Sequence, residues 1–514
     1  MKLFSKIIKQ SVIGLALQYQ LKRVFSLLLI FIAVFHAASG ADFTFTPTAQ
    51  KAYAEAFKFK IRAAKTALLT EKQNSPFRLY LENYIDLIEI LNTDDEAYYD
   101  KIKDREDERL DAITDLDKNS PYNRFLRAEI KMHWALCKIR FGHELKAAYN
   151  IIEASKLLEE NQKLFPDFLP NYKSLGCLHV IIGSVPDNFR WALKILGLKG
   201  SVNQGLLELE KASKDPVWGN EAQYCGYYIQ SFVGKLDDKE QAGLLKFIDN
   251  QPDNFNVHFI GLAVSMRSNN AEQAQRILKK LPSGGDYIHC PIIDLYRADV
   301  ALMKGQYQQA SGYYANYLRN PTIKTFLKDT YYKLFLSYYL VNNDKQAMAY
   351  LTKIPLVGNT VSEGDKAAEK FYDNYAKTRT LPHKSLLQTR LALDGGFYAQ
   401  ALDLIESVAQ QELSTQKEKT EYSLLAGRAL HRNGQADKAI PYFERAIMLN
   451  EKQPWYFGAN AALQLGYIFQ EKGQKNQAKL YFEKAISYKN HEYKNTIDSK
   501  ARAALSEIGF KANQ

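Results

Sequence analysis

The sequence predicts an all-α fold, a right-handed solenoid of helical hairpins whose N-terminal half is helical but irregular. Helix breakers are sparse, with 27 glycines and 15 prolines in 514 residues, which favours long helices joined by short turns. A pattern of small and aromatic residues recurs at near-constant spacing toward the C-terminus. No segment shows the alternation of apolar and polar residues that is typical of strands joined by hairpin turns.

Residues 1–40 predict an export signal. Two basic residues precede a short apolar run at 24–34, and small residues lead to a cleavage point expected at Ala41. The run is short for a membrane span, so we expect a cleaved signal peptide, with an uncleaved N-terminal anchor as the alternative. The sequence after the signal has no Asn-x-Ser/Thr acceptor, since Asn320-Pro321-Thr322 is excluded by its proline, and this favours a bacterial periplasm. The expected location is periplasmic, with secreted or membrane-anchored forms as alternatives.

The net charge of +11 overstates how basic the remaining chain is. Residues 1–40 hold five of the 68 basic residues and none of the 57 acidic ones, which leaves +6 for residues 41–514. Nucleic-acid binding by charge requires a clustered basic stripe, and the sequence has none. The composition therefore predicts no nucleic-acid partner.

Residues 41–250 are predicted to form a degenerate region of helical repeats. The first helix is expected over 47–69, where alanines recur at helical spacing. Further helices are expected at 77–91, 94–116, 121–142, 144–163, 167–183 and 186–196.

Carboxylates are concentrated at 94–117, where lysines and arginines are interleaved with them. The end of this run resembles the start of a calcium-binding loop. However, Ser120 and Leu126 occupy the positions at which such a loop requires a glycine and a bidentate glutamate. The interleaved charges instead predict a solvated helix face.

The stretch WALKILGLKGSVNQGLLELEKA, residues 191–212, resembles both a phosphate loop and a turn between helices. A phosphate loop needs GxxxxGK[ST] after a strand, but here the lysine precedes its glycine and the preceding segment is helical. We expect Gly197 to end one helix, Ser201 to cap the next and Gly205 to allow close packing.

The clearest repeat matches residues 424–449 to residues 463–488. Five pairs of equivalent positions lie 39 residues apart: Gly427 and Gly466, Gly434 and Gly473, Ala439 and Ala478, Phe443 and Phe482, Ala446 and Ala485. The first glycine lets two helices approach, and the second ends the first helix in a left-handed conformation. The alanines allow the helices to cross, and the phenylalanine fills the core between them.

Weaker copies precede these two, so residues 251–495 are predicted to form one array. The expected turns and crossing alanines are Asn269 and Ala274, Gly305 and Ala310, Asn342 and Ala347, and Gly396 and Ala401. The longest spacing between successive crossing alanines accommodates an insertion at 355–382. The core of this insertion, EGDKAAEKFYDNYAK, predicts an extra helix. Residues 496–514 are predicted to form a capping helix that covers the last apolar face.

This pattern resembles the tetratricopeptide repeat (TPR), in which a small residue, a glycine turn, an alanine, an aromatic and an alanine recur over about 34 residues. The resemblance covers the second half of the chain and implies a TPR superhelix. A fainter resemblance covers residues 178–212, which are similar to a signature of a eukaryotic TPR family linked to inclusion-body clearance. The predicted export signal departs from that family, so its cellular role is not carried over.

No motif for catalysis or metal binding is present in the sequence. The histidines are scattered, and HExxH, HxH and GxSxG do not occur. The cysteines lie far apart in or beside apolar helical stretches, which predicts buried free thiols: Cys137, Cys177, Cys225 and Cys290. We therefore expect no enzyme activity, cofactor or metal. The alternative is that the N-terminal region is an enzyme or a small-ligand binder. A closed cleft in which histidine 133, 143 or 179 lies beside carboxylates would support this alternative.

In a TPR-like array, the first helix of each pair lines the inner groove. The inward positions that are not packing positions are Tyr332, Tyr339, Arg390, Arg428, His431, Asn460, Tyr467 and Gln470. Aromatic and arginine side chains are frequent binding anchors, although such tyrosines can also fill the space between repeats. The predicted function is an exported, non-enzymatic scaffold that binds a protein or peptide through this groove, with a membrane-anchored periplasmic adaptor as an alternative.

Overall fold

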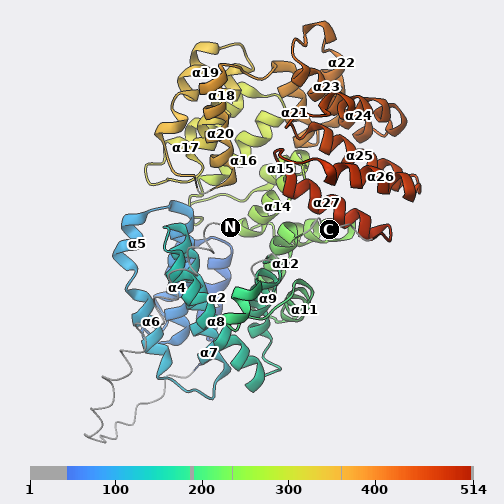
Figure 1. Cartoon of the computed structure of the whole chain (residues 1–514). Coiled ribbons are helices and arrows are strands. Elements are labelled where there is room, and N and C mark those ends of the chain that lie inside the picture. Colours follow the sequence, from blue (N-terminus) through green and yellow to red (C-terminus); the bar gives the residue numbers. More distant parts are fainter. Residues whose placement is uncertain (1–42, 186–189, 234–235, 361, 511–514) are drawn as a thin grey trace, which may run out of the picture. The chain divides into compact units, whose positions relative to one another are not determined.

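The computed structural model describes residues 43–185, 190–233, 236–360 and 362–510 (Figure 1). These residues form helices and short connections, without a strand in those ranges, so the predicted all-α fold is confirmed. No helix within the same ranges is long and apolar enough to cross a membrane. The expected signal at 1–40 and the start of the helix expected at 186–196 lie outside the described residues.

The helices group into two compact units. The first runs to Ser268 and includes Ile277–Pro291 and Pro321–Ile323, whereas the second comprises Asn269–Arg276, Ile292–Asn320 and the chain from Lys324 onward. Helix α15 (Ala271–Lys280) is divided between them.

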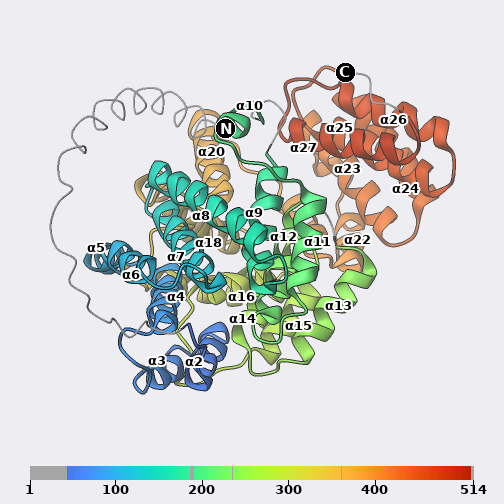
Figure 2. The same ribbon diagram turned by 90° about the horizontal axis from the view of Figure 1, so that it is seen from below.

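The first unit is built from hairpins, of which α7 with α8 and α9 with α11 are the most closely packed (Figure 2). Helices α2, α4, α7 and α9 begin with proline in the first turn, where its fixed φ suits a helix start. The helices are α2 (Pro47–Phe57), α3 (Ile61–Leu68), α4 (Pro76–Thr93), α5 (Glu96–Ile102), α6 (Arg105–Thr114), α7 (Pro121–Arg140), α8 (Glu144–Leu164), α9 (Leu169–Gly183), α10 (Arg190–Ile195), α11 (Val202–Ala212), α12 (Gly219–Val233), α13 (Asp238–Asp249) and α14 (Phe255–Arg267).

The second unit consists of further hairpins, of which α23 with α24 and α25 with α26 lie side by side (Figure 1). The helices are α16 (Ile292–Met303), α17 (Tyr307–Leu318), α18 (Leu327–Tyr339), α19 (Asp344–Leu351), α20 (Glu363–Thr378), α21 (Lys384–Gly395), α22 (Tyr398–Glu406), α23 (Gln416–Arg432), α24 (Ala436–Asn450), α25 (Phe457–Glu471), α26 (Lys475–Ser487) and α27 (Lys494–Glu507), with short 3-10 turns at Ile354–Leu356 and Gln410–Glu412.

Glycines hold α9 and α11 close together. Gly197 has a φ of +73°, and the Ser201 hydroxyl accepts a hydrogen bond from the Gln204 N–H at 3.2 Å, as expected for a helix stop and an N-cap. A Cβ at Gly205 would lie 2.4 Å from the backbone oxygen of Gly176 on α9. The stretch 191–212 therefore contains most of α10, the turn at Gly197 and all of α11, which packs tightly on α9, and it is not a phosphate loop.

The prediction of a single helix over 47–69 is wrong, because the helix is interrupted at Phe59. This residue has a φ of +65° and separates α2 from α3. Its carbonyl accepts a hydrogen bond from the Ile288 N–H at 2.9 Å, and its ring packs on Phe255 with centroids 5.9 Å apart. These contacts come from segments remote in sequence, so they override the local helical pattern.

The acidic run at 94–117 is also not a simple solvated face. Asp94 is buried against Arg140, and Glu106 is buried with its Oε2 2.6 Å from Lys138 Nζ. Arg109, which interrupts the run, is buried too. The interleaving of opposite charges reflects ion pairing with neighbouring helices as well as exposure to solvent.

The repeat positions of the second unit occupy equivalent places in successive hairpins. The residues expected in the turns all have positive φ: Asn269, Gly305, Asn342, Gly396, Gly434 and Gly473. The crossing alanines are all fully buried: Ala274, Ala310, Ala347, Ala401, Ala439 and Ala478. The last two hairpins add Gly427, Phe443 and Ala446, and Gly466, Phe482 and Ala485, where a Cβ on the glycine would lie 2.7 or 2.4 Å from the phenylalanine ring.

The stacking order changes at the insertion. Helix α18 packs against α17, α19 and α20, whereas α21 packs against α16. The side-chain amide of Gln400, on α22, donates to the Lys304 carbonyl at 3.3 Å, and a Cβ at Gly396 would lie 2.3 Å from the Asn269 carbonyl oxygen. The hairpin after the insertion therefore returns to the turns next to α16.

Candidate functional site

The predicted groove residues all lie on first helices of hairpins in the second unit. Helix α18 carries Tyr332 and Tyr339, α21 carries Arg390, α23 carries Arg428 and His431, and α25 carries Asn460, Tyr467 and Gln470. Helices α21, α23, α25 and α27 pack in that order, each against the next. Side chains on successive first helices can therefore reach one another.

The arginines join α21 to α23 in both directions. Arg390 of α21 donates to the carboxylate of Glu421 on α23. In return, Arg428 of α23 donates from Nη2 to Oδ1 of Asp394 on α21 at 3.1 Å. Two ion pairs of opposite polarity thus fix this pair of helices, and they balance the charges of the two arginines.

The same face continues across α25 to α27. His431 Nε2 lies 3.2 Å from Glu471 Oε2 on α25, and the Gln470 amide donates to Glu507 Oε2 on α27 at 3.3 Å. Sequence analysis missed these acidic partners because each belongs to a neighbouring repeat. A search for acids at first-helix positions one repeat away would have found them.

Four of the groove side chains carry a buried polar atom that has no hydrogen-bond partner among the described residues. The atoms are Arg390 Nε, His431 Nδ1, Asn460 Oδ1 and Gln470 Oε1. Each of these side chains reaches the surface, because each residue is only partly buried. An unpaired buried polar atom costs about 1–3 kcal/mol, so a ligand toward which these side chains could turn and pair would relieve that cost.

The two predicted tyrosines on α18 are not part of this open face, because the insertion covers them. The Tyr332 ring lies 4.7 Å from the Phe371 ring of α20, and burial raises the pKa of Tyr332 to about 12. The Tyr339 hydroxyl donates to the Pro382 carbonyl at 2.9 Å, and Lys384 Nζ lies 4.4 Å above its ring. Both tyrosines therefore serve packing between α18 and the inserted segment.

A second pair of tyrosines lies near the two arginines, and sequence analysis missed it. The rings of Tyr456 and Tyr493 meet edge to face with centroids 5.0 Å apart. Burial raises the pKa of Tyr456, while the positive charges of Arg390 and Arg428 act in the opposite direction. These tyrosines precede α25 and α27 in connecting segments, outside the helix positions that the repeat pattern marks.

Tyr467 lies on α25 and packs in part against the core of its hairpin. Its ring meets Phe482 edge to face with centroids 5.4 Å apart, and burial raises its pKa. The residue is only partly buried, so one edge of the ring stays accessible.

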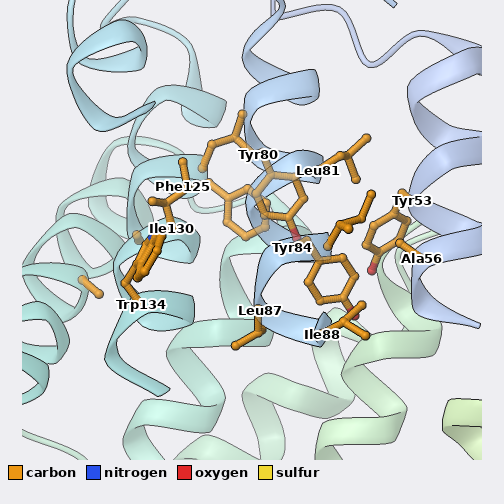
Figure 3. Close-up of a cluster of buried hydrophobic side chains, with 14 of the residues drawn as sticks. Tyr53, Ala56, Tyr80, Leu81, Tyr84, Leu87, Ile88, Phe125, Ile130 and Trp134 are labelled. Carbon is orange, nitrogen blue, oxygen red and sulfur yellow. The ribbon is translucent and has the colours of Figure 1, made fainter. Parts of the chain in front are cut away.

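The first unit holds a buried charge cluster that sequence analysis missed. Lys173 Nζ on α9 lies 2.6 Å from Glu129 Oε2 on α7 and 2.9 Å from Glu221 Oε2 on α12. The hydroxyls of Tyr53 and Tyr80 donate to the two glutamates, Tyr53 to Glu221 at 2.5 Å and Tyr80 to Glu129 at 3.4 Å. Figure 3 shows both tyrosines within the hydrophobic cluster of this unit. One cation, two anions and two hydroxyl donors thus satisfy one another in the core.

His133 borders this cluster and stays neutral in the folded protein. Its Nδ1 lies 2.9 Å from Asn83 Nδ2, and its ring stacks on Tyr84 with centroids 5.3 Å apart. Burial, with a contribution from the positive charge of Lys173, lowers the pKa of His133 to about 3.

Stability should therefore fall on acidification through His133. The unfolded chain binds a proton at this histidine below the ordinary pKa of 6.5, whereas the folded chain does not until about pH 3. Between those limits we expect protonation of this residue in the unfolded chain to lower the free energy of unfolding by about 1.4 kcal/mol for each pH unit of acidification. Urea unfolding of the wild type and of His133→Gln at pH 7 and pH 5 measures the difference. Equal losses in both proteins would contradict the prediction.

The three histidines considered for an N-terminal active site do not converge. His179 Nδ1 lies 2.5 Å from Glu208 Oε2 on α11, His133 contacts Asn83, and His143 is exposed. The described part of the chain has cavities of about 600 and about 570 Å³, and none of these histidines lines either. The described residues also contain no group of three His, Cys, Asp or Glu side chains placed to hold a metal ion.

The cavity of about 600 Å³ lies in the first unit, between α3, α4, α5 and α6. Four basic side chains line it, and each is already paired with a carboxylate: Lys65 with Glu89, Arg78 with Glu82, and Arg105 and Arg109 with Asp86. These pairs balance the basic charge, so the cavity is not built as an anion site.

Comparison with known proteins gives matches among solved structures but none among curated proteins. Among solved structures, the P58(IPK) TPR domain is 13% identical, with a TM-score of 0.21, and covers 84% of this chain and 99% of its own. An IFIT1 monomeric mutant with Gppp-AAAA is 15% identical, with a TM-score of 0.30 and the same coverage.

A family model described as "Tetratricopeptide repeat" matches residues 420–453 and 459–492. The first match covers most of α23 and all of α24, and the second covers most of α25 and all of α26. Each match thus contains one glycine turn and one crossing alanine of the predicted pattern, at Gly434 and Ala439 and at Gly473 and Ala478. The chain therefore carries tetratricopeptide repeats at residues 420–453 and 459–492.

Proposed function

We propose that this protein is an exported, non-enzymatic scaffold that binds a protein or peptide partner through the first-helix face of α21, α23 and α25. The unpaired polar atoms of Arg390, His431, Asn460 and Gln470 carry the proposal. An extended peptide presents backbone N–H and C=O groups in alternation, and this face offers both donors and acceptors to them. The arginines and the adjacent Tyr456 supply the kind of side chain that anchors protein interfaces.

Site-specific cross-linking tests which face is used. A photoreactive phenylalanine analogue replaces Tyr467 on α25 or, as a matched control, Tyr481 on the second helix α26; both tyrosines are partly buried. We expect a protein adduct in native cells from position 467 and not from position 481, measured by immunoblot and mass spectrometry. Equal yields at the two positions would refute the assignment of the groove.

Charge reversal tests the arginines. Arg390→Glu with Arg428→Glu breaks both pairs between α21 and α23 and places like charges together, so we expect at least a tenfold drop in the adduct yield at position 467, equivalent to about 1.4 kcal/mol. Arg445→Glu on the exposed face of α24 is the matched control and should leave the yield unchanged. Circular dichroism melting of each variant checks that the fold is retained. An unchanged yield in a folded double variant would contradict the proposal.

Export predicts a mature chain that begins at Ala41. The prediction rests on the basic residues, apolar run and small residues of 1–40. Mass spectrometry of the N-terminal peptide from native cells measures it. A chain that retains residues 1–40 and fractionates with membranes would instead support the membrane-anchored adaptor.

A further inference from the structure

Two cysteines of the first unit lie on helices that pack against each other. Cys177 lies on α9 and Cys225 on α12, and the Cys177 thiol is among the causes that raise the pKa of Cys225. Both residues are only partly buried, whereas Cys137 and Cys290 are buried. The pair therefore consists of the two less buried cysteines.

The neighbouring ion pair places the two cysteines close together. Lys173 precedes Cys177 by four residues on α9, and Glu221 precedes Cys225 by four residues on α12. Residues four apart lie on the same face of a helix, one turn above each other. The Lys173 Nζ to Glu221 Oε2 contact of 2.9 Å holds the two helices together at one turn, and the two cysteines lie at the next turn of each helix.

We propose that Cys177 and Cys225 form a disulfide that joins α9 to α12. Two cysteines one turn beyond a 2.9 Å side-chain contact between packed helices need little movement of the backbone to bring their sulfur atoms to bonding distance. In the cell, the oxidising compartment comes from the proposed export, while the capacity to form the bond belongs to the fold itself.

The oxidant is a small disulfide such as oxidised glutathione. The Cys177 thiolate attacks one sulfur of that disulfide, forms a mixed disulfide and releases one glutathione thiolate. The Cys225 thiolate then attacks the Cys177 sulfur and displaces the second glutathione. Two protein thiols and one oxidised glutathione thus become one protein disulfide and two glutathione thiols, which take up the two protons.

Cys177 is the better first nucleophile, because the neighbouring Cys177 thiol and burial raise the pKa of Cys225 well above its usual range. The resulting bond would constrain the chain between two successive hairpins. A disulfide that closes a loop of this kind restricts the conformations of the unfolded chain and therefore raises the temperature of unfolding.

Thiol mapping of the full chain tests the proposal. Reduced, folded protein is incubated with oxidised glutathione, and the remaining thiols are alkylated after unfolding and mapped by peptide mass spectrometry. We expect a linked peptide pair that contains Cys177 and Cys225 and is two hydrogens lighter than the sum of its reduced peptides, while Cys137 and Cys290 are alkylated. We also expect the oxidised protein to unfold several degrees higher than the reduced protein.

A Cys177→Ser variant is the matched control, in which Cys225 should be alkylated or carry glutathione and the thermal shift should vanish. Two alkylated cysteines in the oxidised wild type, or glutathione attached to both, would overturn the proposal. The test is made on purified protein, so its result is independent of whether residues 1–40 are cleaved in cells.

Discussion

Replacing Lys173 by methionine is expected to lower the free energy of unfolding of the first unit by about 3–5 kcal/mol, since removing one partner of a buried ion cluster leaves uncompensated charge in the core. Lys173 is the only cation within hydrogen-bond distance of Glu129 and Glu221 among the described residues, and all three are buried. Urea unfolding, with hydrogen exchange of peptides from α9, measures the loss.

Two further variants separate charge from packing. Lys280→Met removes a lysine whose pair with Asp249 is mostly solvent-exposed, and we expect its effect to stay within about 0.5 kcal/mol. The triple change Lys173→Met, Glu129→Gln and Glu221→Gln removes all three charges and should regain a substantial part of the lost stability. A triple variant as unstable as Lys173→Met would show that lost packing, not unpaired charge, causes the effect.

Gly205→Ala is expected to destabilise the first unit by about 1–3 kcal/mol, because the added methyl group cannot fit without moving a backbone. Its Cβ would lie 2.4 Å from the Gly176 carbonyl oxygen and 2.6 Å from Val180 Cγ2. Helices α9 and α11 would have to separate. Thermal and urea unfolding of the variant measure the cost.

Gly226→Ala is the matched control on a neighbouring helix of the same unit. A Cβ at Gly226 on α12 meets no atom within 4 Å, so alanine should stabilise the helix by about 0.5–1 kcal/mol through its better helix propensity. Opposite signs for the two substitutions are the expected result. A stabilising Gly205→Ala would refute the close crossing of α9 and α11.

The sequence predicted most reliably those features that recur at a fixed spacing. The buried alanines from Ala274 to Ala478 and the left-handed turns from Asn269 to Gly473 follow from the steric demands of crossing helices, which act within one hairpin. The helix end and helix start within residues 191–212 were predictable for the same reason. Local chemistry decides whether a helix stops, and the residues that stop it are adjacent in the chain.

Features that depend on remote partners were not predictable from one sequence. Lys173 lies 44 residues from Glu129 and 48 from Glu221, so no local pattern connects them. The break at Phe59 likewise depends on Ile288 and Phe255. In the groove, the repeat pattern located the first helices but could not show that α20 covers Tyr332. The inserted helix is not part of the repeat, so its position in the fold cannot be predicted from the repeat spacing.

The return of α21 to α16 makes the second unit branched rather than linear. In a linear solenoid each hairpin contacts only its neighbours, so loss of one hairpin separates those on either side of it. Here α16 packs against both α17 and α21, and residues 324–382, which lie between α17 and α21 in the sequence, pack through α18 on α17. We expect that segment to open locally while α21 keeps its contact with α16, so a change in its length need not interrupt the repeats that follow.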